Sequence, residues 1–199
     1  MGVMNYQMIY LLTALILSSL SGCVSISDYT SNQLSSELPT LAEQNHWKIT
    51  GKLAIRSQHK AQSINLIWQQ QNTRYKINVS SPIGFGAATI TGNQQQTTLQ
   101  QGLKTLSGTP DQLGTELLGV PLSADAMSWW LKGLISPNHS KASHIIHKNN
   151  QLSRFQQNGW QLQFNEYTAN GPYMLPKKIS GRRGDLSFKL VVSQWNFYN

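Results

Sequence analysis

The chain has 199 residues, of which 16 are basic and 8 are acidic, so its formal net charge at pH 7 is +8. This length is enough for one domain with a substantial core. Only 12% of the residues are charged and the basic ones are scattered, whereas nucleic-acid-binding domains usually carry dense basic clusters with interleaved aromatic residues. The composition argues against nucleic-acid binding and favours a place beside anionic lipid headgroups, which attract Lys and Arg.

The N-terminus carries an apolar run at residues 9–20, shorter than the roughly 20 residues that a membrane-spanning helix needs. Small residues follow, as in a secretory signal, and lead into Cys23, the only cysteine of the chain. Leu20-Ser21-Gly22-Cys23 looks like a bacterial lipobox, in which residues 1–22 are cleaved off and the cysteine receives an S-diacylglycerol and an N-acyl group. The alternative is a buried, unmodified cysteine inside an uncleaved membrane anchor. Because acylation uses the one thiol, we expect packing and not disulfides to hold the fold.

Residues 24–45 are polar and rich in serine, with Leu34, Leu38 and Leu41 at helical spacing and Pro39 between them. This pattern predicts a flexible tether that runs into a short, weak amphipathic helix. We therefore expect residues 23–45 to connect the acylated cysteine to a single folded domain at residues 46–199.

From Trp47 the hydrophobic pattern changes to period two. Apolar and polar residues alternate at 47–56, 64–68 and 75–79, with a turn expected at 71–73. Shorter runs follow at 86–107, broken at Gly92-Asn93 and near Gly102. Such alternation predicts antiparallel strands with one apolar and one wet face, and the short spacing predicts a meander.

The period then shifts to that of helices. Residues 110–118 and 123–134 predict two helices, with Ser123 as the N-cap of the second. Strand patterns resume after a loop at 136–143, and Asn158-Gly159 between alternating apolar runs predicts a hairpin. The sequence therefore predicts a mainly β fold, in which a few helices pack against one strongly curved antiparallel sheet.

The sequence carries no recognisable catalytic or metal site. It has neither a Gly-x-x-x-x-Gly-Lys phosphate loop nor a Gly-x-Ser-x-Gly nucleophile turn. His144 and His147 have no carboxylate or cysteine beside them, so a solvated pair is favoured over a metal site. The other histidines stand alone in the sequence: His46, His59 and His139. We expect a protein that is not an enzyme and that uses no cofactor or metal, apart from the covalent lipid on Cys23.

Two apolar features give better leads to function. The apolar faces of sheet and helices either pack into an ordinary filled core or enclose a cavity for an apolar ligand, and the sequence leaves both open. The turn at residues 80–86 contains Ile83 and Phe85, although turn tips usually carry polar residues. Either these side chains fold back into the core, or Ile83 projects toward a membrane or an acyl chain.

Several motifs share their order and spacing with a known family. They are the lipobox, Trp47 with Gly-Lys-Leu-Ala-Ile-Arg at 51–56, Trp68-Gln69-Gln70, Pro82-Ile83-Gly84, Leu-Gly-Val-Pro-Leu at 118–122, and Trp130-Leu131-x-Gly133. Together they resemble the LolB family of outer-membrane lipoproteins over nearly all of the chain that follows Cys23.

The resemblance implies a half-open β-barrel with a helical lid around a hydrophobic cavity for acyl chains. It implies a receptor anchored on the periplasmic side of the outer membrane of a Gram-negative bacterium. This receptor accepts acylated lipoproteins from the periplasmic carrier LolA and inserts them into the membrane without nucleotide hydrolysis. In the family an apolar residue of the Pro-x-Gly turn, typically leucine, is needed for insertion, and Ile83 stands there. Val24 in place of aspartate after Cys23 fits the family's rule for outer-membrane sorting.

The apolar strand faces supply candidates for the cavity and the second helix supplies candidates for its lid. The cavity candidates are Leu53, Ile55, Leu66, Trp68, Ile77 and Val79, and the lid candidates are Trp129, Trp130 and Leu134. The expected partners are LolA, acylated cargo and outer-membrane lipids, with the protein itself a monomer. The alternatives are a structural or assembly lipoprotein with a filled core, and a carrier of another apolar ligand.

Overall fold

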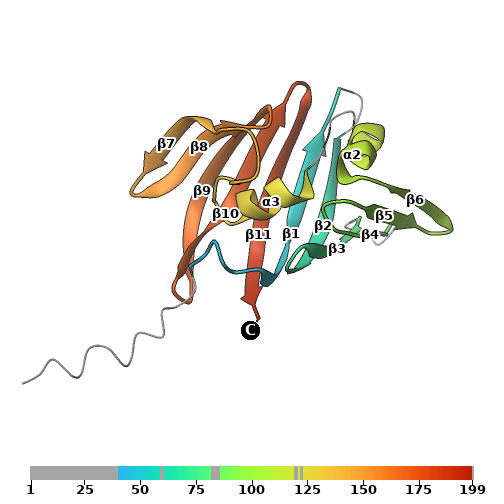
Figure 1. The fold of residues 1–199 in the computed structure, drawn as a ribbon, viewed down its shortest axis with the longest axis horizontal. Helices are drawn as coiled ribbons and strands as arrows, with labels where there is room; N and C mark the ends of the chain where they lie inside the picture. The colour runs from blue at the N-terminus through green and yellow to red at the C-terminus, as the bar shows by residue number, and fades with distance from the viewer. Residues whose placement is uncertain (1–39, 59–60, 82–85, 119–120, 122, 199) are drawn as a thin grey trace, which may run out of the picture. The chain divides into compact units, whose positions relative to one another are not determined.

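The computed structural model describes residues 40–198, except 59–60, 82–85, 119–120 and 122. Within these residues, eleven strands form one open antiparallel sheet (Figure 1). The strands are β1 (His46–Arg56), β2 (Ala61–Gln71), β3 (Arg74–Ser80), β4 (Ala88–Gly92), β5 (Thr97–Gln101), β6 (Lys104–Gly108), β7 (Ser143–Lys148), β8 (Gln151–Gln157), β9 (Trp160–Asn170), β10 (Tyr173–Arg183) and β11 (Leu186–Phe197). Their order is β6-β5-β4-β3-β2-β1-β11-β10-β9-β8-β7, so β1 pairs with β11 where two meanders meet.

The register shows which connections between strands lie at each of the two ends of the sheet. The connections that follow β1, β3, β5 and β10 lie toward one end, which we call the Leu103 end. Register pairs beside these connections are Arg56↔Ala61, Val79↔Ala88, Gln101↔Lys104 and Arg183↔Leu186. The connections that follow β2, β4 and β9 lie toward the other end, together with the first residues of β1, and we call it the Trp47 end.

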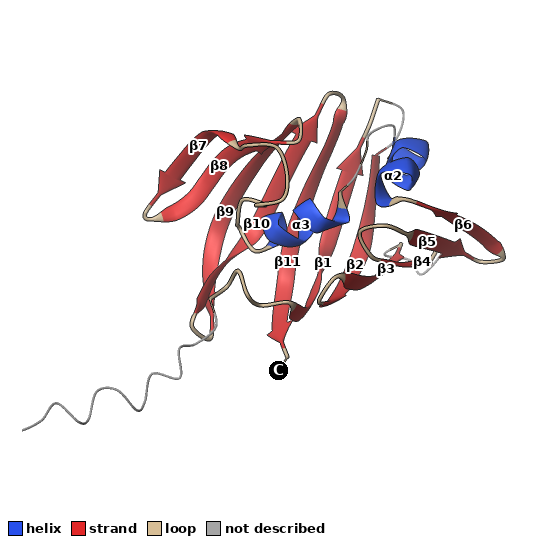
Figure 2. Ribbon diagram, viewed as in Figure 1, coloured by secondary structure: helices blue, strands red, loops and turns tan. Residues whose placement is uncertain are grey.

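Two helices, α2 (Pro110–Leu118) and α3 (Ala124–Leu131), accompany the sheet in the part of the chain that the structure describes (Figure 2). Thr109 and Gln112 cap α2 reciprocally, since Thr109 Oγ1 accepts from the Gln112 amide at 3.2 Å and Gln112 Oε1 accepts from the Thr109 amide at 2.9 Å. α3 lies across one face of the sheet, in front of β11 and β1 (Figure 1). Neither helix is long and apolar enough to span a membrane.

The helix predicted over 110–118 is confirmed, whereas the one predicted over 123–134 is shorter. α3 ends at Leu131 and Lys132 is its C-cap. Gly133 follows with φ of +75°, a left-handed conformation that favours glycine and commonly ends a helix. Leu134 therefore lies beyond the helix.

An aromatic cluster closes the Trp47 end of the concave face. Trp47 lies 5.9 Å from Trp68 and 5.3 Å from Trp195 between ring centroids, and Trp68 lies 6.0 Å from Tyr75. All four side chains are buried. Tilted aromatic pairs at these distances stabilise a core beyond the area that they bury.

The prediction of a mainly β fold with one antiparallel sheet and a few packed helices is confirmed. The hairpin at Asn158-Gly159 joins β8 to β9, and both residues have positive φ, as a two-residue hairpin turn of this kind requires. The predicted signal at 1–22, Cys23 and most of the predicted tether at 23–45 lie outside the described residues.

Candidate functional site: an apolar cavity

A cavity of about 280 Å³ lies between the concave face of the sheet and the two helices, and its lining is almost wholly apolar. Strands β1, β2, β3, β10 and β11 supply aliphatic side chains, while α2 supplies Leu113 and α3 supplies Met127, Trp130 and Leu131. The structure thus combines the two alternatives that the sequence left open, since a filled aromatic core adjoins a hollow apolar space.

The six strand residues predicted for the cavity all line it: Leu53, Ile55, Leu66, Trp68, Ile77 and Val79. Of the three predicted lid residues, Trp130 lines the cavity but Trp129 and Leu134 do not. Consecutive residues of a helix point about 100° apart, so Trp129 lines a separate, polar pocket beside Lys132. The binding of acyl chains by these residues remains a prediction.

On the N-terminal strands, the inner face of the sheet becomes more exposed from the Trp47 end toward the Leu103 end, whereas Trp160 and Leu186, at the Leu103 end of β9 and β11, are buried. On β1, Ile49 is buried and Ile55 half-buried, and on β2, Trp68 is buried and Ile64 half-buried. The same change runs along β3 from Tyr75 to Val79 and along β5 from Thr97 to Leu99. The cavity is therefore closed at the Trp47 end, and along β1, β2, β3 and β5 it reaches solvent toward the Leu103 end.

Sequence reasoning missed the part of the wall that comes from the C-terminal strands and α2. These residues are Leu113, Trp160, Ile179, Leu186, Phe188 and Leu190. One signal is Gly181, because a Cβ there would lie 2.3 Å from Phe188 Cε1. A glycine within a strand often marks such a close approach, and here it lets the Phe188 ring lie across β10 as part of the wall.

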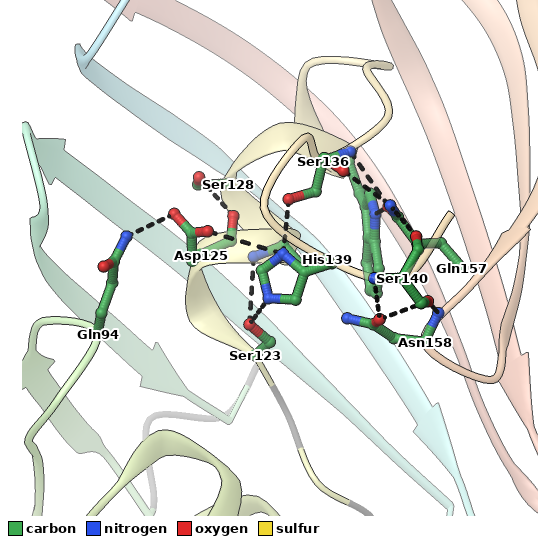
Figure 3. A network of polar contacts seen from close by, with 11 residues as sticks. Gln94, Ser123, Asp125, Ser128, Ser136, His139, Ser140, Gln157 and Asn158 are labelled. Carbon is green, nitrogen blue, oxygen red and sulfur yellow. Dashed lines mark hydrogen bonds and ion pairs between the residues drawn. The ribbon is translucent and has the colours of Figure 1, made fainter. Parts of the chain in front are cut away.

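A polar network holds the N-terminus of α3 in place over the cavity (Figure 3). His139 bridges Ser123 Oγ and Ser136 Oγ, at 2.8 Å each. Asp125 Oδ2 lies 3.7 Å from His139 Nδ1, and this nitrogen already forms the hydrogen bond with Ser136 Oγ. Ser123 Oγ also accepts from the Ala126 amide at 3.4 Å. His139, which stands alone in the sequence, thus belongs to a capping network, and this network lacks the close carboxylate–imidazole contact of a catalytic triad.

Gln157, the last residue of β8, holds the C-terminal part of the same helix. Its side chain accepts from Trp130 Nε1 at 2.9 Å and donates to the Ser136 carbonyl at 2.7 Å and the Ser140 carbonyl at 2.9 Å. Gln157 is buried, and these bonds satisfy its amide. The orientation of Trp130, which forms the lid side of the cavity, is therefore set by β8.

Ser123→Ala is expected to lower the free energy of unfolding by about 1 kcal/mol, because it removes the N-cap of α3. Urea unfolding measures the change. Ser128→Ala is the matched control, since Ser128 Oγ donates to the Asp125 carbonyl inside the same helix and caps nothing. Equal losses in the two variants would contradict the capping role.

Lys132 is a buried cation just beyond the C-terminus of α3, and it is only 3% exposed. Its Nζ donates to the carbonyls of Ala42 at 3.4 Å and Gln44 at 3.2 Å, and lies 4.8 Å from the Trp129 ring centroid. Burial lowers the pKa of Lys132 to about 8. Lys132 therefore ties the segment before β1 to the end of α3.

Lys132→Met is expected to abolish a rise in stability above pH 8. The unfolded chain keeps the Lys132 proton up to about pH 10.4, whereas the folded chain releases it near its lowered pKa of about 8. Between these values the unfolded state binds more protons, so the free energy of unfolding rises with pH, by about 1 kcal/mol up to pH 9.5. Urea unfolding at pH 7 and pH 9.5 measures the rise. The exposed-site control Lys148→Met should keep it, and an undiminished rise in Lys132→Met would contradict the assignment.

The remaining sequence candidates lie elsewhere. Ile83, Phe85 and Cys23 are outside the described residues. His144 and His147 are exposed on β7, and the described residues contain no cluster of three or more His, Cys, Asp or Glu side chains that would hold a metal ion.

Comparison with known proteins points to one family. A family model described as outer membrane lipoprotein LolB matches residues 45–195. An outer-membrane lipoprotein LolB of Pseudomonas aeruginosa is 31% identical over 194 residues, which cover 92% of this chain and 94% of that protein. Another, of Pseudomonas fluorescens, is 35% identical over 152 residues, which cover 75% and 73%. The crystal structure of a LolA superfamily protein from Nitrosomonas europaea shares the fold with a TM-score of 0.53 at 8% identity, covering 79% of this chain and 88% of that one.

Proposed function

The chain belongs to the LolB family of outer-membrane lipoproteins, and from this membership we propose that it receives acylated lipoproteins in its apolar cavity and passes them into the outer membrane. The carrier that delivers them is LolA. The protein is held at the periplasmic side of that membrane by acyl groups on Cys23, which follows a cleaved signal. Its broad role is lipoprotein sorting at the outer membrane.

The observation that carries this proposal is the cavity. Each buried methylene stabilises an acyl chain by about 0.8 kcal/mol, so a long chain is held out of water by roughly 10 kcal/mol. A receptor must offer an apolar surface of comparable extent, and the space of about 280 Å³ under α3 has an almost wholly apolar lining. The half-buried aliphatic residues toward the Leu103 end provide the entrance for the chain.

Transfer proceeds down a free-energy gradient. The sequence holds no nucleotide-binding loop, so the acyl chains move from a weaker binding site on the carrier to this cavity and then to the bilayer. The net positive charge of the chain favours docking to an acidic carrier and to anionic headgroups. Ile83, which follows β3 in the sequence, promotes the last step.

The test mixes the soluble domain, beginning at Val24, with a LolA-type carrier loaded with an acylated lipoprotein. The cargo is expected to move to the soluble domain without any nucleotide. Crosslinking from a photoreactive residue at Ile77 or Val79 should then capture the acyl chains. Absence of transfer together with absence of any adduct would contradict the receptor function and favour a structural or assembly lipoprotein. Binding of a free lipid without transfer would favour a carrier of another apolar ligand.

A further inference from the structure

Leu103 is the most exposed large apolar side chain among the described residues, at 105% of its reference area. It stands beside Gly102 at the tip of the hairpin between β5 and β6 (Figure 1). Gly102 has φ of +57° and nothing lies within 4 Å of the Cβ position there, so the tip contacts no other part of the described structure at that point. Hairpin tips usually carry polar residues, and a leucine held fully in water suggests a contact surface.

The register places this tip beside the connection between β3 and β4. Thr89 near the start of β4 pairs with Gln100 of β5, and Gln101 pairs with Lys104 on the other side of the tip. Ser81 and Gly86, the described residues that flank the β3–β4 connection, therefore lie toward the same end of the sheet as Leu103. The cavity also reaches solvent toward this end, as the half-buried Val79 and Leu99 show.

The charge of this half of the molecule indicates which kind of partner it meets. Residues 44–110, which supply β1 to β6, contain no Asp or Glu and seven basic residues: Lys48, Lys52, Arg56, Lys60, Arg74, Lys76 and Lys104. Lys104 directly follows Leu103 and is exposed. Asp185, in the connection between β10 and β11, accepts from Gln58 and is the acidic exception that the described residues bring to this half. An exposed apolar tip on strands whose own charged side chains are all basic matches an anionic bilayer, since such lipids attract each nearby Lys or Arg by about 1 kcal/mol.

We propose that the β5–β6 hairpin is a membrane contact of its own, in which Leu103 enters the interface of an anionic bilayer. The basic residues toward the same end of the sheet, Lys52, Arg56 and Lys104, then face its headgroups. The proposal rests on the membrane role proposed above and adds an element and an orientation to it. The cavity mouth then faces the bilayer, so that an acyl chain leaving the cavity emerges beside the lipid and not into water.

The predicted tether is long enough for this orientation. Extended at about 3.5 Å per residue, the chain from Cys23 to Thr40 reaches at most about 60 Å. The 11-residue strand β1 is about 37 Å long. An anchor that joins the domain near the Trp47 end thus leaves the Leu103 end free to reach the same membrane.

The test uses the full acylated chain in vesicles of phosphatidylethanolamine and phosphatidylglycerol, without carrier or cargo. Because Cys23 is the only cysteine and is acylated, Leu103→Cys supplies a single thiol for an environment-sensitive fluorophore. Met174→Cys is the matched control, since Met174 is 46% exposed and lies toward the Trp47 end. The fluorophore at 103 is expected to shift its emission to the blue and to be quenched by lipid-borne nitroxides, unlike that at 174. Replacing phosphatidylglycerol by phosphatidylcholine should reduce the shift by about half or more.

Equal, water-like emission at the two positions would overturn the proposal. So would a response at 103 that appears only after a carrier protein is added, because the hairpin would then be a protein-docking surface. A lipid-dependent response at 103 in a protein that accepts no cargo would support the membrane contact while contradicting the receptor function. The two proposals therefore fail separately.

Discussion

Ile77→Trp is expected to weaken cargo acceptance about 50-fold while leaving the fold intact. Ile77 lies in the middle of β3, is half-buried and lines the cavity, opposite Ile90 of the neighbouring strand. An indole there occupies space that the acyl chain needs. Exclusion of about three methylenes costs about 2.4 kcal/mol of binding, which corresponds to that change in affinity.

The measurement is a titration of the soluble domain with a fluorescent acylated peptide, alongside a thermal unfolding curve. Ile145→Trp is the matched control, because Ile145 lies on β7, is 45% exposed and does not line the cavity. The control should bind the peptide as the wild type does. Unchanged binding by a folded Ile77→Trp protein would show that acyl chains bind elsewhere.

The unfolding temperature of Ile77→Trp also tests whether the cavity is filled. Adding a large side chain to a filled core usually costs 1–3 kcal/mol. Addition of the same side chain to a hollow space costs little and can add apolar burial. An unfolding temperature at or above that of the wild type therefore supports a cavity that is unfilled without ligand, independently of the binding result.

The sequence predicted the sheet well because alternation is a local property. One face of β1, β2 and β3 reads directly as Leu53, Leu66, Ile77 and their neighbours, and these residues do meet in space. The hairpin at Asn158-Gly159 was likewise predictable, since that dipeptide adopts positive φ at low cost. For these elements the local pattern and the tertiary contacts agree.

What the sequence did not predict depends on contacts between distant segments. The residues around His139 do not indicate its hydrogen bond with Ser123, which lies 16 positions earlier in the sequence. The two side chains meet only because the chain turns back after α3. Trp129 and Trp130 are adjacent and similar, and only the packing of Trp130 against Gln157 decides which of them faces the cavity. Whether an apolar face is filled or hollow is likewise set by the spacing of helix and sheet, which periodicity does not encode.

Ile83→Glu is expected to separate acceptance of cargo from its delivery. If Ile83 acts at the bilayer, a carboxylate there must be desolvated or withdrawn when the turn meets lipid, and either outcome disfavours insertion. The substitution changes none of the described residues that line the cavity, so the variant should accept cargo from the carrier with wild-type affinity. Release into vesicles should fall at least 10-fold, as measured by flotation of the cargo with lipid after a fixed time.

The control for this prediction is Ile83→Leu, which restores the residue typical of the family and should deliver cargo normally. Thermal unfolding distinguishes the alternative in which Ile83 folds back into the core, because a buried glutamate would then lower the unfolding temperature strongly. Reduced stability with normal delivery by the folded fraction would place Ile83 in the core. In that case the Leu103 hairpin would be the remaining apolar tip toward the cavity mouth among the described residues, and Leu103→Glu would be expected to show the delivery defect instead.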